Sequence, residues 1–193
     1  MHEKNNMNPN SLISKAIKVA INAHQGQSRK DDKDTPFVVH PIGVALRISQ
    51  YTSDPIIIAA ALLHDTVEDT QLTNEEIKTE FGDEVAKITA ELTEPSREVM
   101  SWKERKEYYL NHIGGASLAA RMISCTDKID NLESLIEAYD KQGTKMWDNF
   151  NSKNLWFYES VFEKLASHQD MQPLIENYKS TLAKAQLIIK PAV

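Results

Sequence analysis

Apolar residues recur every three or four positions along most of the chain, which is the period of an amphipathic helix. In segment 11–24 they form one stripe after a polar start: Leu12, Ile13, Ala16, Ile17, Ala20 and Ile21. Segments 118–138 and 152–166 show the same spacing over longer stretches, and segment 171–189 closes the chain. We therefore expect these segments to be helices that each bury one face.

The most apolar part of the chain is segment 55–64, which predicts a helix buried on most of its sides. Its isoleucine run has a high strand propensity. The lengths of the apolar segments and the absence of tight hairpin signals nevertheless favour helices. Residues 25–35 are polar and charged, and they predict a loop.

Polar residues and prolines mark where further helices start. Thr73 with Glu76, and Ser101 with Glu104, have the spacing of capping boxes. Segment 41–50 predicts a short helix with proline at its first position, where that residue is well tolerated. The remaining breaks fall at Gly82, Pro95 and the pair Gly114-Gly115.

These elements together predict an all-α fold. The chain has 193 residues, of which 41% are hydrophobic and 26% are charged, as is usual for one globular domain with a sizeable core. We find no internal repeat, low-complexity linker or shift in composition. We therefore expect residues 1–193 to form a single domain.

Charge and cysteine content narrow the class of protein. With 22 basic and 28 acidic residues, the net charge of −6 argues against a dedicated binder of nucleic acid or anionic membranes. Residues 1–10 lack the apolar core of a signal peptide, and no apolar run reaches the ~18–20 residues of a membrane helix. The single cysteine, Cys125, excludes an internal disulfide framework. We expect a soluble cytoplasmic protein.

Four ionisable residues crowd together directly after the most apolar segment. His64 and Asp65 end the apolar run, and Glu68 and Asp69 follow one helical turn later. On a helix, His64 shares a face with Glu68, and Asp65 shares one with Asp69. Three carboxylates this close repel one another unless a cation neutralises them. Taken alone, a His-Asp pair is more often a surface or capping pair, but this clustering indicates a metallohydrolase site.

A metal site needs further ligands, and two residues at the edges of apolar segments are candidates. His40 precedes Pro41, and Asp127 lies within segment 123–128. A buried ionisable side chain at such a place needs a partner. Two imidazoles with two carboxylates suit Mn²⁺, Fe²⁺, Co²⁺ or Zn²⁺ better than Ca²⁺ or Mg²⁺. We do not expect Cys125 as a ligand, because it belongs to another helix face than Asp127.

The order of these residues resembles the His…His-Asp…Asp signature of the HD-domain phosphohydrolases. Arg29-Lys30 and segments 35–42, 61–70 and 127–132 are similar to the hydrolase domain of the Rel/Spo family, and the chain length is similar to its free-standing small alarmone hydrolases. The similarity covers about residues 11–166, with residues 167–193 as a C-terminal helical extension. It implies a single HD-domain helical bundle that removes the 3′-pyrophosphate from (p)ppGpp.

The resemblance also implies roles for individual residues. The metal ligands that it implies are His40, His64, Asp65 and Asp127. They would hold one Mn²⁺ per chain, with other divalent transition metals as alternatives. Glu68 and Asp69 match the catalytic acidic pair, which would orient the attacking water and take its proton.

A nucleotide pocket follows from the same resemblance. Arg29 and Lys30 match a basic pair that stacks on a purine and meets phosphate, although a solvated pair of loop charges is the alternative. Asn131, four residues after Asp127, matches an asparagine that contacts the ribose. The remaining candidates are Lys103, Arg105 and the neighbouring Lys106 for phosphate, with an exposed helix face as the alternative, and Tyr158 for the nucleotide. Trp156 and Phe157 are expected in the core.

Two departures from the family pattern leave the substrate open. Glu133 stands where many relatives have arginine, and segment 124–126 is more polar than usual. The alternatives are a (p)ppApp-preferring hydrolase, another HD-type nucleotide phosphohydrolase, an enzyme that also acts on NADPH, and an inactive nucleotide sensor. The expected partner is a small nucleotide rather than nucleic acid or a membrane, and both a monomer and a homodimer are compatible with the sequence.

Overall fold

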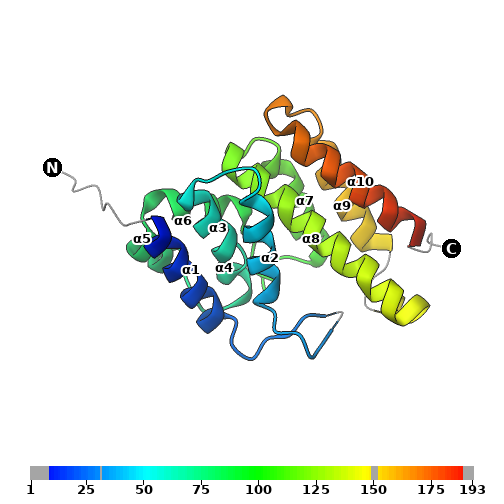
Figure 1. Cartoon of the computed structure of the whole chain (residues 1–193), viewed down its shortest axis with the longest axis horizontal. Coiled ribbons are helices and arrows are strands. Elements are labelled where there is room, and N and C mark those ends of the chain that lie inside the picture. The colour runs from blue at the N-terminus through cyan, green and yellow to red at the C-terminus, as the bar shows by residue number, and fades with distance from the viewer. Residues whose placement is uncertain (1–8, 31, 149–151, 189–193) are drawn as a thin grey trace.

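A computed structural model describes residues 9–30, 32–148 and 152–188, and within them the predicted all-α fold is confirmed (Figure 1). The α-helices are α1 (Pro9–Ala23), α2 (Val39–Ile48), α3 (Pro55–Leu63), α4 (Thr66–Asp69), α5 (Asn74–Phe81), α6 (Asp83–Leu92), α7 (Trp102–Ile113), α8 (Leu118–Gln142), α9 (Ser152–Leu165) and α10 (Gln172–Ile188). Two 3₁₀ segments, Gly143–Asp148 and Gln169–Met171, follow α8 and α9. The N-terminal segment 1–8 and residue 189, the last residue of a predicted helix, lie outside the described residues.

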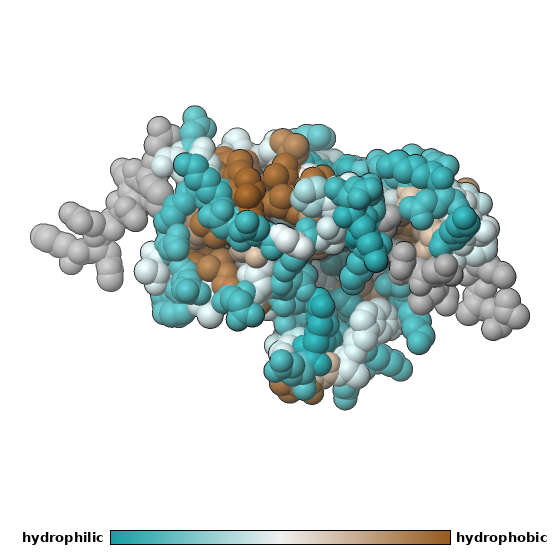
Figure 2. Space-filling view, turned by 90° about the horizontal axis from the view of Figure 1, so that it is seen from below, coloured by the Kyte–Doolittle hydropathy of each residue, from teal (hydrophilic) through white to brown (hydrophobic). Residues whose placement is uncertain are grey.

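Helix α8 forms the centre of the molecule. Figure 1 shows α1 to α6 on one side of it and α10 on the other. Four of its large apolar side chains are fully buried: Ile123, Ile129, Leu132 and Leu135. They pack against several neighbouring helices, including α2, α6 and α10. The outer face that is turned downward in Figure 1 is mostly hydrophilic, as amphipathic helices require (Figure 2). Helix α8 can therefore carry side chains that face both halves of the bundle.

Helix α3 is the buried apolar helix that segment 55–64 predicts. Asp54 caps its start by accepting a hydrogen bond from the backbone N–H of Ile56, and Pro55 occupies the first position. All residues from Ala59 to Leu63 are buried. In the described part of the chain no helix, including this one, is long and apolar enough to cross a membrane.

Both predicted capping boxes are present. The Thr73 hydroxyl accepts from the N–H of Glu76, and the Glu76 carboxylate accepts from the N–H of Thr73. Ser101 and Glu104 form the same reciprocal pair at the start of α7. These two starts are therefore fixed by local sequence alone.

The predicted start of the second helix was wrong by two residues. Helix α2 begins at Val39, so Pro41 is its third residue and not its first. Turn hydrogen bonds from Val39 N–H to Pro36 and from His40 N–H to Phe37 begin the helix early. Proline is still tolerated, because N–H groups in the first turn have no partner within the helix.

We expected His64 to share a helix face with Glu68, and Asp65 with Asp69, which requires one continuous helix. Residues 64–69 do not continue the helix before them, so this expectation was wrong. Helix α3 ends at Leu63, and the short α4 starts at Thr66. The His64 ring and the Thr66 hydroxyl donate hydrogen bonds to the carbonyls of Ala61 and Leu63. Such side-chain bonds compete with the helical ladder and end it. The break leaves His64 and Asp65 in a turn at the end of a buried helix.

Candidate active site

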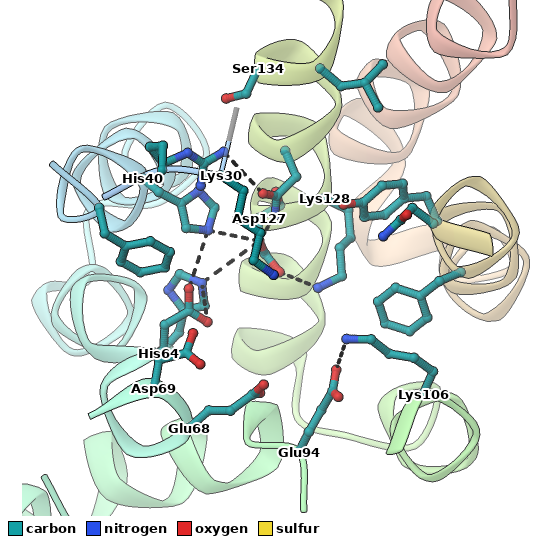
Figure 3. Close-up of a pocket in the computed structure, with 18 of the residues that line it drawn as sticks. Lys30, His40, His64, Glu68, Asp69, Glu94, Lys106, Asp127, Lys128 and Ser134 are labelled. Carbon is teal, nitrogen blue, oxygen red and sulfur yellow. Dashed lines mark hydrogen bonds and ion pairs between the residues drawn. The ribbon is translucent and has the colours of Figure 1, made fainter. Parts of the chain in front are cut away.

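A pocket of about 250 Å³ opens between α2, the α3–α4 turn and helices α7, α8 and α9. Its lining includes all four predicted metal ligands and both predicted catalytic carboxylates. Figure 3 shows His40, His64 and Asp127 pointing toward one another at one end, with Lys106 and Lys128 on the other side of Asp127. The fold thus brings His40 and Asp127, which lie 87 residues apart in sequence, into one pocket.

The predicted ligand atoms lie close together. The Nε2 atom of His40 is 3.2 Å from Asp127 Oδ1 and 3.6 Å from Asp65 Oδ2. The Nε2 atom of His64 is 3.2 Å from Asp65 Oδ1 and 3.9 Å from Asp127 Oδ1. One ligand atom from each of His40, His64 and Asp65 fits within a 4.8 Å span. Two nitrogens and the carboxylate oxygens therefore surround one point.

The outer nitrogens of both imidazoles are engaged, which sets the direction of the inner ones. His40 Nδ1–H donates to Asp130 Oδ2 at 2.7 Å, and His64 Nδ1–H donates to the Ala61 carbonyl at 2.8 Å. His64 Nε2 is buried and makes no hydrogen bond, although it faces the Asp65 carboxylate. A lone pair that faces carboxylate oxygens fits a cation between them. The residues present are therefore suited to hold a divalent metal.

The charges around the site favour proton or metal binding at His40. Burial on its own lowers the pKa of His40, but hydrogen bonds with Asp127 and Asp130 and the charge of Asp65 raise it to about 9. Burial raises the pKa of Asp127, but the Lys128 ammonium and the His40 ring outweigh burial and hold that pKa well below its usual range. Asp127 is therefore a carboxylate at neutral pH, with Oδ2 held by Lys128 and Oδ1 facing the imidazoles.

The predicted catalytic pair also reaches the pocket. Glu68 pairs with Arg105, and Asp69 pairs with Arg97. Burial and then the charges of Glu94 and Asp65 raise the pKa of Glu68. Burial and Asp65 raise the pKa of Asp69, against the effect of Arg97. Both carboxyl groups are thereby adjusted toward proton exchange at pH values closer to neutrality.

Most of the predicted nucleotide-binding residues line the same pocket: Arg29, Lys30, Asn131 and Tyr158. Arg29 donates to Asn131 Oδ1 at 3.4 Å, and Asn131 donates to Asp127 Oδ1. This chain of contacts joins the loop before α2 to the middle of α8, where Asp127 lies. Phe157 is buried as expected and also lines the pocket. Trp156 was wrongly expected in the core, since it is 37% exposed and packs against Trp102.

The basic run on α7 divides into three environments. Lys103 is exposed, pairs with Glu107 at 3.7 Å and does not line the pocket. Arg105 is buried but binds Glu68 and Glu94 and does not face the pocket. Only Lys106 lines the pocket, where its ammonium lies 4.4 Å from the centre of the Phe157 ring. The structure thus does not bring the Lys103 and Arg105 side chains into the lining of the pocket.

Three residues at the site had no predicted role. Lys128 neutralises Asp127, Asp130 holds His40, and Arg97 pairs with Asp69. Lys128 and Asp130 lie within segment 127–132, which carries the family resemblance. The sequence does not show that they contact Asp127 and His40, because these contacts depend on how α8 packs. Glu133, which stands where many relatives have arginine, pairs with Arg47 and does not line the pocket. The buried Cys125 faces the Leu174 carbonyl of α10 and not the site.

Comparison with known proteins supports the same family and fold. A family profile described as an HD domain matches residues 16–153. Over 170 residues the chain is 39% identical to guanosine-3′,5′-bis(diphosphate) 3′-pyrophosphohydrolase MESH1 of Xenopus tropicalis, which covers 83% of this chain and 94% of that protein. The human protein of the same name is 36% identical over 125 residues, covering 64% and 69%.

A solved structure is also similar. It is described as a metazoan ortholog of SpoT that hydrolyses ppGpp and plays a role in starvation responses. The match has a TM-score of 0.78 at 26% identity and covers 94% of this chain and 99% of that one.

Proposed function

The chain belongs to the HD-domain family, and we propose that it acts as a guanosine-3′,5′-bis(diphosphate) 3′-pyrophosphohydrolase. Such an enzyme converts (p)ppGpp to GDP or GTP and pyrophosphate and so controls the level of the alarmone. The observation on which the proposal rests is the convergence of the two predicted histidines and the four predicted carboxylates on one pocket that basic residues also line. The chain spans 94% of the length of its Xenopus relative, so the likeness extends over nearly the whole of that hydrolase.

The metal would be held by His40, His64, Asp65 and Asp127. Bound there, a divalent transition metal, in our proposal Mn²⁺, supplies Lewis acidity that activates water and stabilises charge on phosphate oxygens. The chain's own contribution is to present two Nε2 lone pairs and two carboxylates from three elements. Asp130 and the Ala61 carbonyl hold the rings in that orientation.

Glu68 and Asp69 would act as the general base and general acid of the reaction. Their raised pKa values suit carboxyl groups that accept a proton from water and return it to the leaving oxygen. Arg105 fixes the Glu68 side chain from the buried side, and Arg97 does so for Asp69 from the more exposed side. The two arginines thereby limit the conformations that the acidic pair can adopt.

The nucleotide would lie along Arg29, Lys30, Asn131 and Tyr158. A guanidinium can stack on a purine face and an ammonium can bind phosphate. Lys106 is the residue of α7 whose ammonium lines the pocket, so it is the phosphate-binding candidate that replaces Lys103 and Arg105. Nothing in this set reads the edge of the base, and we expect guanine and adenine forms to differ by about tenfold or less in kcat/KM, ~1.4 kcal/mol.

A substrate panel tests this proposal. Purified protein loaded with Mn²⁺ is incubated with ppGpp, pppGpp, pppApp, NADPH and a deoxynucleoside triphosphate, and the products are separated by chromatography. We expect pyrophosphate from the three alarmones. Orthophosphate from NADPH alone, or nucleoside products from the triphosphate alone, would assign the chain to another class of HD phosphohydrolase.

A further inference from the structure

We propose that Asp130 is a positioning residue for the metal site and that Gly43 is a glycine because the Asp130 carboxylate occupies the space beside it. The inference rests on the proposed function only in that His40 is a metal ligand. Asp130 itself is not a ligand in this account, because its carboxylate binds the outer nitrogen of the ring.

The two nitrogens of His40 face two carboxylates of the same helix. Asp127 and Asp130 are three residues apart on α8 and therefore lie on one face, a turn from each other. Asp127 Oδ1 is 3.2 Å from Nε2, and Asp130 Oδ2 is 2.7 Å from Nδ1. The His40 imidazole thus lies between two carboxylates on one face of α8. With Nδ1 protonated for Asp130, the Nε2 lone pair is directed at the site.

The other imidazole is held differently. His64 donates to the backbone carbonyl of Ala61, which no side-chain substitution removes. His40 depends on a side chain that lies 90 residues away. Loss of such a partner typically weakens metal binding ~10–100-fold.

Gly43 gives an independent observation. It lies one turn after His40 on α2, within an ordinary helical backbone. A Cβ atom at position 43 would be 2.6 Å from Asp130 Oδ1, closer than real Cβ contacts allow. Glycine destabilises a helix interior relative to alanine. Its presence here is explained by the room that the carboxylate needs to reach the His40 ring.

The test measures Mn²⁺ affinity of the full-length, chelator-stripped protein by calorimetry for wild type, Asp130→Ala, Asp130→Asn and Gly43→Ala. We expect Asp130→Ala to weaken binding ~10–100-fold. Asp130→Asn should stay within about threefold of wild type, because the amide oxygen still accepts from Nδ1–H. Asp140→Ala, an exposed aspartate on the same helix, is the matched control and should bind as wild type does.

Gly43→Ala gives the sharper comparison. In the wild-type background it should weaken Mn²⁺ binding, because the new methyl group displaces Asp130. In the Asp130→Ala background it should leave the affinity unchanged and raise the melting temperature of the metal-free protein, since alanine favours the helix.

Three results would overturn the inference: undiminished affinity in Asp130→Ala, equal losses in Asp130→Asn and Asp130→Ala, or undiminished affinity in Gly43→Ala. Equal losses of Mn²⁺ affinity in Asp130→Asn and Asp130→Ala would mean that the negative charge of Asp130 matters and its hydrogen bond to His40 does not. If Asp130→Ala does not fold, the other two single variants still decide the question. Wild-type protein that binds no Mn²⁺ would instead contradict the proposed function.

Discussion

Glu68 and Asp69 are adjacent in sequence, yet their arginine partners differ: Arg97 pairs with both carboxylates, whereas Arg105 pairs with Glu68. Arg105, which holds Glu68, is almost completely buried, whereas Arg97, which holds Asp69, is largely exposed. An exposed ion pair contributes little to stability, while a buried one fixes geometry strongly. Glu68 is therefore the more rigidly placed of the two carboxyl groups.

Replacing the pair by amides tests its role. In the double variant Glu68→Gln, Asp69→Asn the shapes are kept but the basicity is lost, so kcat should fall ~10²–10⁴-fold. Metal content, measured by elemental analysis, should stay at the wild-type level. Glu75→Gln, at an exposed position on α5, is the control and should be fully active. Turnover above about a tenth of wild type would show that the pair is structural.

His40 makes metal affinity depend on pH. The pKa of His40 in the metal-free fold is about 9, above the ordinary 6.5. Between pH 6.5 and 9 the ring therefore carries a second proton, which the metal must displace. Apparent Mn²⁺ affinity should rise about tenfold per pH unit through that window and level off above it. The sign for stability is opposite: the proton stabilises the metal-free fold below pH 6.5, and this is lost as the pH rises through 9.

Calorimetric titrations at several pH values between 6.5 and 10 measure this effect. Titration in buffers of different ionisation enthalpy also reports the proton released when metal binds. Affinity that does not change with pH over that range would contradict the account of His40.

Single residues differ in how far sequence could predict them. His64, Asp65, Glu68 and Asp69 are neighbours in the chain, so their clustering is visible in the sequence. Asp130 and Gly43 acquire their roles only where α2 crosses α8, and no local pattern records that contact. Their partners follow from tertiary packing.

At the scale of elements, the three basic residues of α7 lie in different environments although they are close in sequence. Lys103 and Lys106 are three residues apart and so share a side of the helix, but Lys103 lies in the exposed first turn of α7. Arg105 is turned by about 100° from Lys106. Only Arg105 and Lys106 face inward, and they meet the same buried acid, Glu94. The family resemblance implied a phosphate role for the run, but the place of each residue on α7 decides which side chain lines the pocket.

Two alanine substitutions on α7 separate these environments. Arg105→Ala removes the buried partner of Glu68 and one of the two basic partners of Glu94, so it should lower the free energy of unfolding by ~3–5 kcal/mol and reduce kcat. Lys103→Ala removes an exposed charge and should change stability by about 0.5 kcal/mol or less. Denaturant unfolding and steady-state kinetics measure both. A large rise in KM for Lys103→Ala would show that this lysine reaches the phosphates after all.

Helix existence was predicted better than helix ends. Capping boxes at Thr73 and Ser101 are local and were correct, whereas the break between α3 and α4 was missed. There the His64 and Thr66 side chains bond to carbonyls of the preceding turn, and Thr66 is fully buried. These contacts depend on how the buried turn packs, so the sequence does not show them.

At the scale of the whole molecule, the candidate metal site joins elements that pack on different sides of the core. His40 comes from α2, His64 and Asp65 from the α3–α4 turn, and Asp127 from α8. A metal bound to all of them connects the N-terminal helices to the central helix. The carboxylates that gather there repel one another when no cation is present.

Metal loading should therefore stabilise the whole fold. At a free Mn²⁺ concentration one hundred times Kd, the expected gain is ~2.7 kcal/mol. For a chain of this size that corresponds to a rise in Tm of about 5–10 °C. Thermal unfolding of chelator-stripped and reloaded protein measures the change. His64→Ala, which lacks one ligand, should show no such rise, and a full rise in that variant would place the metal elsewhere.

The most direct test of the proposed function is the product ratio from ppGpp. Chelator-stripped protein is reloaded with Mn²⁺, and the GDP and pyrophosphate formed are quantified over time. We predict equal amounts of GDP and pyrophosphate, formed only after Mn²⁺ is restored and absent in His64→Ala. Orthophosphate as the first product, or undiminished pyrophosphate release from the stripped protein, would contradict a metal-dependent 3′-pyrophosphohydrolase.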